Sequence, residues 1–118
     1  MAFSLRDTFT IFAEMNVPAQ YVRLGGGGAR SSLWRQIQAD VYGLPIEIIE
    51  AEEGAAYGAA LLAGVGGGHW PGVDAACDEV VRVKSRINPQ ADVAQLMNRR
   101  YEKFRALYPA LVNIFERP

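Results

Sequence analysis

The chain has 118 residues, of which 50% are hydrophobic and 21% are charged, and its net charge is −1. This composition is typical of one globular domain or part of one, and it excludes a disordered tail and a fibrous repeat. The balance of charge gives no global case for binding nucleic acid or an anionic membrane, and no apolar run approaches the ~20 residues of a bilayer span.

An amphipathic helix is predicted over 4–15, because its apolar residues recur at spacings of three and four. Ser4 and Asp7 have the spacing of a capping box, which would satisfy free amides at the helix start. Pro18 is expected to keep the helix from continuing, since proline disfavours a helical conformation in the residue before it.

A β-loop-α-β unit is predicted next. Its parts are a strand over 20–24, the glycine run Gly25–Gly28, a helix from Ser31 or Ser32 to about Tyr42, and a strand over 46–49. Gly43 is expected to end the helix. Two strands joined through one helix should lie parallel, with a right-handed crossover.

A third helix is predicted over 54–65, preceded by Glu52 and Glu53, whose carboxylates suit the positive end of the helix dipole. Its face carries Gly54 and Gly58, and each glycine in a helix interior costs ~1 kcal/mol against alanine. Close packing of this face on the sheet is the favoured reason, and close approach to a ligand is the alternative.

The remaining segments are predicted as a loop over 66–72, a region over 73–83 that fits a short helix (73–79) or a strand (80–83), and a long helix over 90–116. The long helix carries a single apolar stripe. Pro109 lies inside it, so we expect a kink or break near 105–108.

Cys77 and His69 are the only cysteine and histidine in the sequence. One cysteine cannot form a disulfide within the chain, which favours a reducing, cytoplasmic location. The two residues are also too few for a zinc site, so we expect no metal ligated by this chain. Cys77 is interpreted as inert and His69 as an exposed loop residue.

The glycine run between a strand and a helix is the main candidate for a ligand site, because bare amides and a helix N-terminus can bind phosphate. Such runs also form plain turns. A Walker A loop is excluded, since Ala29-Arg30-Ser31 stands in place of Gly-Lys-Ser/Thr. A dinucleotide fingerprint fails at its sixth position, although Glu50 lies about twenty residues downstream, where that fold places its ribose-binding acid. Dinucleotide binding therefore stays open.

Three other residues invite a functional interpretation and are assigned structural roles. Asp40 lies more than two turns into its predicted helix, so we interpret it as structural and not as a catalytic base. Trp34 and Tyr57 are interpreted as core residues and not as platforms for stacking a base.

Three stretches carry a family resemblance: Leu24-Gly25-Gly26-Gly27-Gly28-Ala29-Arg30-Ser31 with Leu33-Trp34-Arg35-Gln36 and Gly43-Leu44-Pro45, then the acid-Gly-Ala block over 52–63, then the Tyr- and Arg-rich helix over 101–108. Together they resemble the C-terminal domain of the FGGY family of carbohydrate kinases. The resemblance covers nearly the whole chain. Gly25 departs from it, since family members often have Thr, Ser or Asp there.

The resemblance implies an α/β fold: part of an actin-like, ribonuclease H-like ATPase domain, with a short parallel sheet, packed helices and a long C-terminal helix. Residues 1–118 would be the C-terminal part of the second, nucleotide-binding lobe, and the N-terminal sugar-binding lobe would be absent. In the family the catalytic Asp lies upstream. We therefore expect no catalytic residue in this chain and no activity from it alone.

The same resemblance implies a set of residues that bind the nucleotide: Gly26, Gly27, Gly28, Ala29, Arg30 and Ser31. Gly26 and Gly27 would face the α-phosphate and ribose, Ser31 would lie near the adenine, and the residues between would form a wall. ATP with Mg²⁺ is the implied cofactor, with the metal site mostly outside this chain.

The full-length protein would transfer the γ-phosphate of ATP to a pentulose, D-xylulose first, with ribulose and gluconate left open. The missing lobe would bind most of the sugar, and we expect neither nucleic acid nor membrane as a partner. Surfaces left bare in a partial domain, such as the Gly/Ala helix or the sheet edge, predict self-association. The rival interpretation is a stand-alone, non-enzymatic nucleotide- or dinucleotide-binding or interaction domain.

Overall fold

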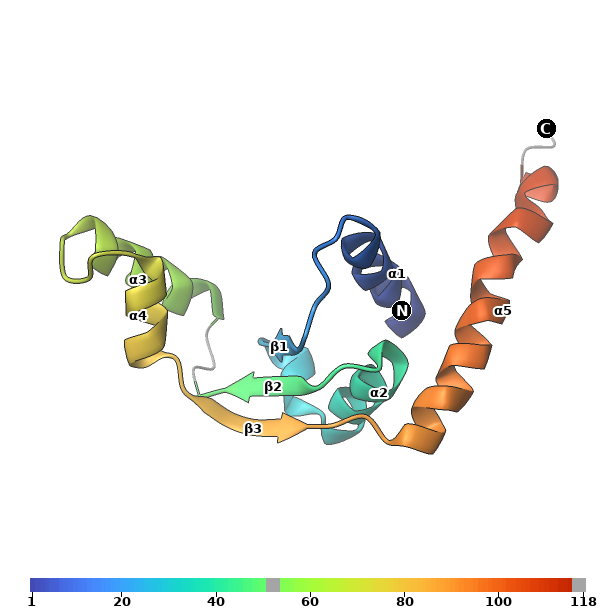
Figure 1. Cartoon of the computed structure of the whole chain (residues 1–118), viewed down its shortest axis with the longest axis horizontal. Coiled ribbons are helices and arrows are strands. Elements are labelled where there is room, and N and C mark those ends of the chain that lie inside the picture. The colour runs from blue at the N-terminus through green and yellow to red at the C-terminus, as the bar shows by residue number, and fades with distance from the viewer. Residues whose placement is uncertain (51–53, 116–118) are drawn as a thin grey trace.

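The computed structural model describes residues 1–50 and 54–115. Its elements, in chain order, are α1 (Ala2–Glu14), β1 (Val22–Leu24), the 3-10 helix η1 (Gly27–Arg30), α2 (Ser32–Tyr42), β2 (Ile46–Ile49), α3 (Gly54–Gly66), α4 (Val73–Val80), β3 (Val83–Ile87) and α5 (Ala91–Phe115). In Figure 1 the sheet and α2 form a base, with α3 and α4 at one end, α5 at the other and α1 between them.

The sheet has the strand order β1-β2-β3. β1 and β2 are parallel, with Val22 opposite Ile46, which confirms the predicted pair. β3 runs antiparallel to β2, so the sheet is mixed, with a register shift between Ile48 and Ile49. Of the two alternatives for 73–83, the helix is the one observed: α4 continues to Val80, and the strand begins three residues later than the strand alternative placed it.

The core lies between the sheet and α2. Ala39, Val41 and Tyr42 of α2 are buried against Ile46 of β2. α2 ends as predicted at Gly43, whose φ of 67° is left-handed and whose amide donates to the carbonyl of Ala39 at 2.9 Å. The buried stretch of α2 thereby fixes the helix between the sheet, α1 and α5.

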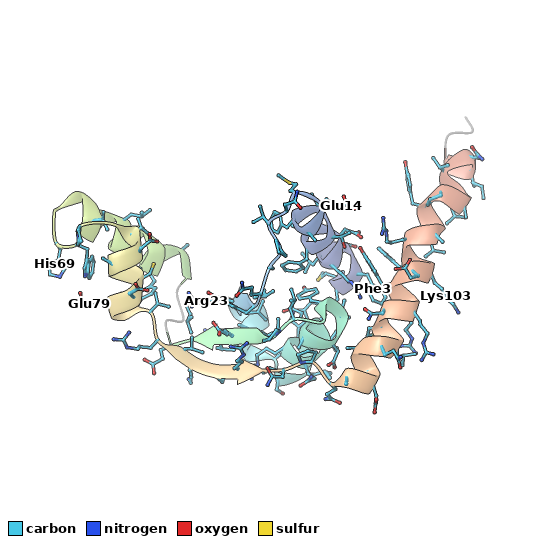
Figure 2. The ribbon with its side chains drawn as sticks, in the orientation of Figure 1. Phe3, Glu14, Arg23, His69, Glu79 and Lys103 are labelled. Atoms are coloured by element: carbon cyan, nitrogen blue, oxygen red, sulfur yellow. The ribbon has the colours of Figure 1, made fainter. Side chains whose placement is uncertain are left out.

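The first and last helices meet over α2, as Figure 2 shows from the position of Phe3 beside α5. The Phe3 ring lies 5.9 Å from that of Tyr101 and 5.5 Å from that of Phe104. The predicted capping box is wrong, because α1 begins at Ala2 and Ser4 lies inside its first turn. Asp7 instead accepts a hydrogen bond from Tyr101.

The long C-terminal helix is continuous from Ala91 to Phe115, so of the predicted kink or break near 105–108 the break does not occur. Proline removes one amide donor, which leaves the carbonyl of Arg105 without its helical partner. Arg105 is exposed, and water can satisfy that carbonyl.

α3 packs on α4 and not on the sheet. The Trp70 ring lies so close to Gly64 that a β-carbon there would be 2.4 Å from it, and the Trp70 indole donates to Glu79 at 2.9 Å. A β-carbon on Gly54 or Gly58 would meet no atom within 4 Å. The predicted close packing of that glycine face on the sheet is therefore wrong in this chain; the predicted Glu52 and Glu53 lie outside the described residues.

The chain is more extended than a compact domain of its size. Its radius of gyration is 18.1 Å, whereas about 14 Å is expected for this length. Its accessible surface is 8317 Å², against about 6,300 Å² for a folded monomer of this mass. The chain therefore leaves roughly 2,000 Å² more surface exposed than a self-contained domain would. In the part of the chain that the structure describes, no helix combines the length and the apolar character needed to cross a membrane.

A candidate nucleotide site at the strand ends

A cavity of about 470 Å³ lies at the carboxyl ends of β1 and β2, where β3 begins. In open α/β sheets, ligands bind outside the carboxyl ends of parallel strands, and this volume is in the range of small-molecule sites. The cavity is lined by Leu24, Gly25, Gly26, Ala29, Arg30, Arg35, Ile48, Ile49, Glu50, Lys84 and Ser85.

The glycine run forms one wall of this cavity. Gly26 has φ 72° and ψ −168°, a conformation that is essentially restricted to glycine. The amide of Ala29 donates to the carbonyl of Gly26 at 3.1 Å, which turns the chain into η1. A β-carbon on Gly25 would meet no atom within 4 Å. Gly25 and Gly26 therefore present bare backbone to the cavity.

The six residues predicted to bind the nucleotide divide into two groups. Gly26, Ala29 and Arg30 line the cavity, whereas Gly27, Gly28 and Ser31 are not among its lining residues. Gly28 faces the Trp34 indole, with 3.6 Å between a β-carbon built there and the ring. The Ser31 hydroxyl caps α2 by accepting from the amide of Trp34 at 3.2 Å, so a role for it toward adenine stays a prediction.

The cavity has more positive than negative side chains. Among residues 1–50 and 54–115, Arg30, Arg35 and Lys84 line it, and Glu50 is the acidic residue among its lining. Arg35 is half-buried, and its Nε atom is buried without a hydrogen-bond partner among the described residues. A buried donor without an acceptor is unusual, because it loses its hydration and gains nothing in return.

Sequence reasoning missed Lys84 and Ser85 as site residues. Both belong to β3, an antiparallel strand that brings a segment more than thirty residues beyond β2 back beside its end. The pairing of β3 with β2 cannot be predicted from any local pattern of residues. Arg35 belongs to a stretch that carries the family resemblance, and the distance of Glu50 from the glycine run is the one sequence signal that points to it.

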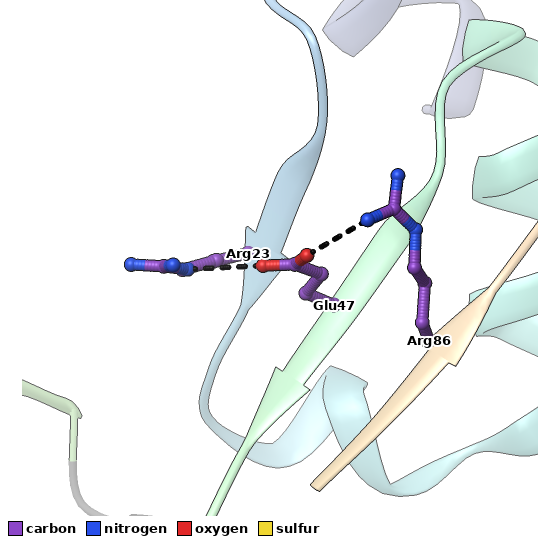
Figure 3. A network of polar contacts seen from close by, with 3 residues as sticks. All are labelled: Arg23, Glu47 and Arg86. Carbon is purple, nitrogen blue, oxygen red and sulfur yellow. Dashed lines mark hydrogen bonds and ion pairs between the residues drawn. The ribbon is translucent and has the colours of Figure 1, made fainter. Parts of the chain in front are cut away.

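A single buried carboxylate holds the three strands in register (Figure 3). Glu47 of β2, with a side chain only 9% exposed, accepts from Arg23 of β1 at 3.2 Å and from Arg86 of β3 at 3.3 Å. Arg23 and Arg86 stand directly opposite Glu47 in the two neighbouring strands. Because both arginines are about half exposed, water screens each ion pair and its contribution to stability is modest.

Other polar and aromatic residues have structural roles. Asp40 is buried and accepts from the amide of Gln90 at 2.7 Å, which fastens α2 to the segment before α5. The phenol of Tyr57 donates to the carbonyl of Val80 at 2.8 Å. His69 is exposed beside Trp70, as predicted. No trio of histidine, cysteine or acidic side chains suited to a metal ion occurs among residues 1–50 and 54–115.

A glycine turn and a cavity at the ends of parallel strands are the arrangement of nucleotide-binding α/β domains. Comparison with known families matches residues 1–67 to the FGGY family of carbohydrate kinases, C-terminal domain. The chain belongs to this family, and its mixed α/β fold is that of the actin-like ATPase architecture of the FGGY kinases.

The chain is similar in sequence and structure to several sugar kinases. It is 30% identical to the xylulose kinase of Bacillus subtilis (strain 168), over 98% of this chain and 22% of the relative. It is 35% identical to the autoinducer-2 kinase of Salmonella choleraesuis, over 83% of this chain and 18% of the relative. The crystal structure of the xylulose kinase from Rhodospirillum rubrum superposes with a TM-score of 0.81 at 33% identity, over 98% of this chain and 24% of that one. The chain thus spans about a fifth of the length of these relatives.

Proposed function

We propose that this chain is the ATP-binding part of a carbohydrate kinase and that the cavity beside the glycine turn holds the nucleotide. The observation that carries the proposal is the cavity at the carboxyl ends of β1 and β2, lined by the bare backbone of Gly25 and Gly26, in a member of the FGGY family. Leu24, Ile48 and Ile49 offer apolar surface for a nucleoside, and the basic side chains suit its phosphates.

Gly26, Ala29 and Arg30 are the proposed contacts to the nucleotide that line the cavity directly. Gly27, Gly28 and Ser31 complete the proposed set, as the turn and cap that orient the loop. In phosphoryl transfer a protein mainly positions groups and stabilises charge. When bound, ATP with Mg²⁺ would supply the transferable phosphoryl group; this chain's part is to bind and orient the nucleotide, and the metal ligands are proposed to lie outside it.

We propose that residues 1–118 form the C-terminal part of the nucleotide-binding lobe and that a sugar-binding lobe supplies the catalytic carboxylate. The extended shape and the excess exposed surface support a segment built to pack against more protein. The chain alone is then inactive, and the whole protein works in the cytoplasm. Phosphorylation of D-xylulose by the isolated chain in the presence of ATP would contradict this.

The proposed sugar is D-xylulose, because xylulose kinases are among both the sequence relatives and the solved structures. The similarity to an autoinducer-2 kinase keeps a different sugar derivative as the alternative. A panel of ribulose, gluconate, xylulose and autoinducer-2, assayed with the full-length kinase and ATP, distinguishes them.

A dinucleotide is the second candidate ligand, favoured by one observation. Glu50 lines the cavity at the end of β2, where a dinucleotide-binding fold places the acid that contacts ribose. Calorimetric titration of the chain with ADP and, separately, with NAD separates the two. Binding of ADP without NAD supports the kinase site, and binding of NAD alone would replace it with the dinucleotide one.

We also propose that the isolated chain associates with a second copy through α1 and α5. A groove of about 450 Å³ between these helices is lined by Asp7, Phe104, Arg105, Leu107, Tyr108 and Leu111. Leu107 and Tyr108 are 55% and 68% exposed. The excess exposed surface of roughly 2,000 Å² is more than the ~800 Å² that each partner of a stable dimer buries.

A further inference from the structure

Two cations at the cavity form no ion pair with another of the described residues, although Glu50 lines the same cavity. The Lys84 ammonium makes no ion pair with another described residue, and the Arg35 guanidinium has a buried Nε without an acceptor. They come from different elements, β3 and α2, and both line the same cavity. A bound anion could accept hydrogen bonds from both groups and would give the buried Nε atom of Arg35 an acceptor.

The sheet holds Lys84 at this position. Ser85 pairs with Ile48, and Val83 pairs with Ile49, so Lys84 lies between them at the end of β2. Arg86, two residues further along β3, contacts the buried Glu47 of β2. This segment lies beyond residues 1–67, to which the family comparison extends. The xylulose kinase relatives nevertheless cover 98% of this chain, so their match extends over this segment.

We propose that Arg35 and Lys84 bind a phosphate group of the nucleotide, opposite the bare backbone of Gly25 and Gly26. This inference rests on the proposed nucleotide site and adds the two basic side chains that would bind its phosphate. The bare backbone of Gly25 and Gly26 allows the ligand to approach closely, and the two basic side chains favour an anionic ligand. The cavity should therefore discriminate between a nucleotide and its uncharged nucleoside.

The chain offers a matched control, because Lys84 and Lys103 are its only two lysines. Lys103 lies on α5, well apart from Arg23 of β1 in Figure 2. Lys84→Met and Lys103→Met remove the same charge and keep a similar side-chain length. Calorimetric titration of the wild-type chain and both variants with ADP and with adenosine measures the contribution of each lysine to phosphate binding, and circular dichroism checks that each variant is folded.

Loss of one charge-assisted contact should weaken ADP binding about tenfold in Lys84→Met, while the adenosine affinity of that variant changes less than about twofold. Lys103→Met should bind both ligands like the wild type. Arg35→Gln should resemble Lys84→Met. Acetylation of the two lysines, followed by peptide mass spectrometry, gives an independent readout: ADP should protect Lys84 and leave the rate at Lys103 unchanged.

Two results would overturn the inference. One of them leaves the proposed nucleotide site intact, and the other overturns that site as well. If Lys84→Met binds ADP as tightly as the wild type and ADP leaves Lys84 unprotected, the phosphate lies elsewhere, while loss of ADP binding in Gly25→Ala would keep the proposed nucleotide site. If the wild-type chain binds neither ADP nor adenosine, both this inference and the proposed site are wrong for the chain.

Discussion

The phenol of Tyr101 donates a hydrogen bond to the carboxylate of Asp7 at 2.5 Å and so ties the last helix to the first. The Thr10 hydroxyl lies 3.1 Å from the same phenol oxygen, and the Arg6 guanidinium lies 4.2 Å from the centre of the ring. Burial is the main cause that raises the pKa of Tyr101 above its ordinary value of 10.0, and the hydrogen bond to Asp7 adds to it. This cluster closes α1 and α5 over α2.

Tyr101→Phe should lower the free energy of unfolding by about 1–2 kcal/mol, because it leaves the Asp7 carboxylate without its donor. Urea denaturation at neutral pH measures the loss. Tyr108→Phe is the matched control, since Tyr108 lies on the same helix and is 68% exposed; it should change stability by less than about 0.5 kcal/mol. Equal losses of stability in the two variants would show that the hydrogen bond between Tyr101 and Asp7 does not stabilise the fold.

The same tyrosine predicts a loss of stability in alkali. Because the pKa of Tyr101 is higher in the folded than in the unfolded chain, its contribution is present below the ordinary value of 10.0 and is lost as pH rises through the folded-state pKa. The stability of the wild type above pH 10 should therefore fall more steeply than that of Tyr101→Phe. Parallel pH profiles would rule out this contribution.

Glu47→Ala should destabilise the sheet by about 1–2 kcal/mol, a value kept modest because both of its arginine partners are about half exposed. Loss of the carboxylate leaves Arg23 and Arg86 facing each other across β2. Chemical denaturation measures the change. Glu14→Ala, at the exposed end of α1, is the control and should have little effect; a Glu47 variant as stable as that control would show that these ion pairs contribute nothing.

Gly25→Ala and Gly26→Ala separate backbone strain from ligand contact. Gly26 has a φ of 72°, so alanine there should cost about 1–2 kcal/mol of stability. Gly25 has open space at its β-carbon, so alanine should leave stability nearly unchanged. Both residues line the cavity, and both variants should bind ADP more weakly. A Gly25→Ala chain with wild-type ADP affinity would mean that the nucleotide does not approach this backbone.

Leu111→Glu should convert the self-associated chain to a monomer, because it places a charge in the apolar groove between α1 and α5. Sedimentation velocity at several concentrations measures the oligomeric state. Leu62→Glu, on the exposed side of α3, is the control and should leave association intact. A monomeric wild type at high concentration would contradict the proposal.

The sequence predicted those parts of the fold that depend on local chemistry. Gly43 ends α2 and Ser31 caps it, because each acts on neighbouring backbone groups. The misses depend on distant partners. Asp7 could not be assigned to Tyr101, ninety-four residues away, and the pairing that places Lys84 at the cavity joins strands separated by two helices. The sequence therefore predicted the glycine run and Arg30 of the candidate site, but not Lys84 and Ser85.

The most direct test of the nucleotide site is a titration of the ¹⁵N-labelled chain with ADP, followed through its backbone amide resonances. If ADP binds in this cavity, the resonances of Gly25, Gly26 and Ala29 shift together with that of Lys84, while those of α5 stay in place. Shifts confined to the groove between α1 and α5, or none at the glycine run under saturating ADP, would contradict it.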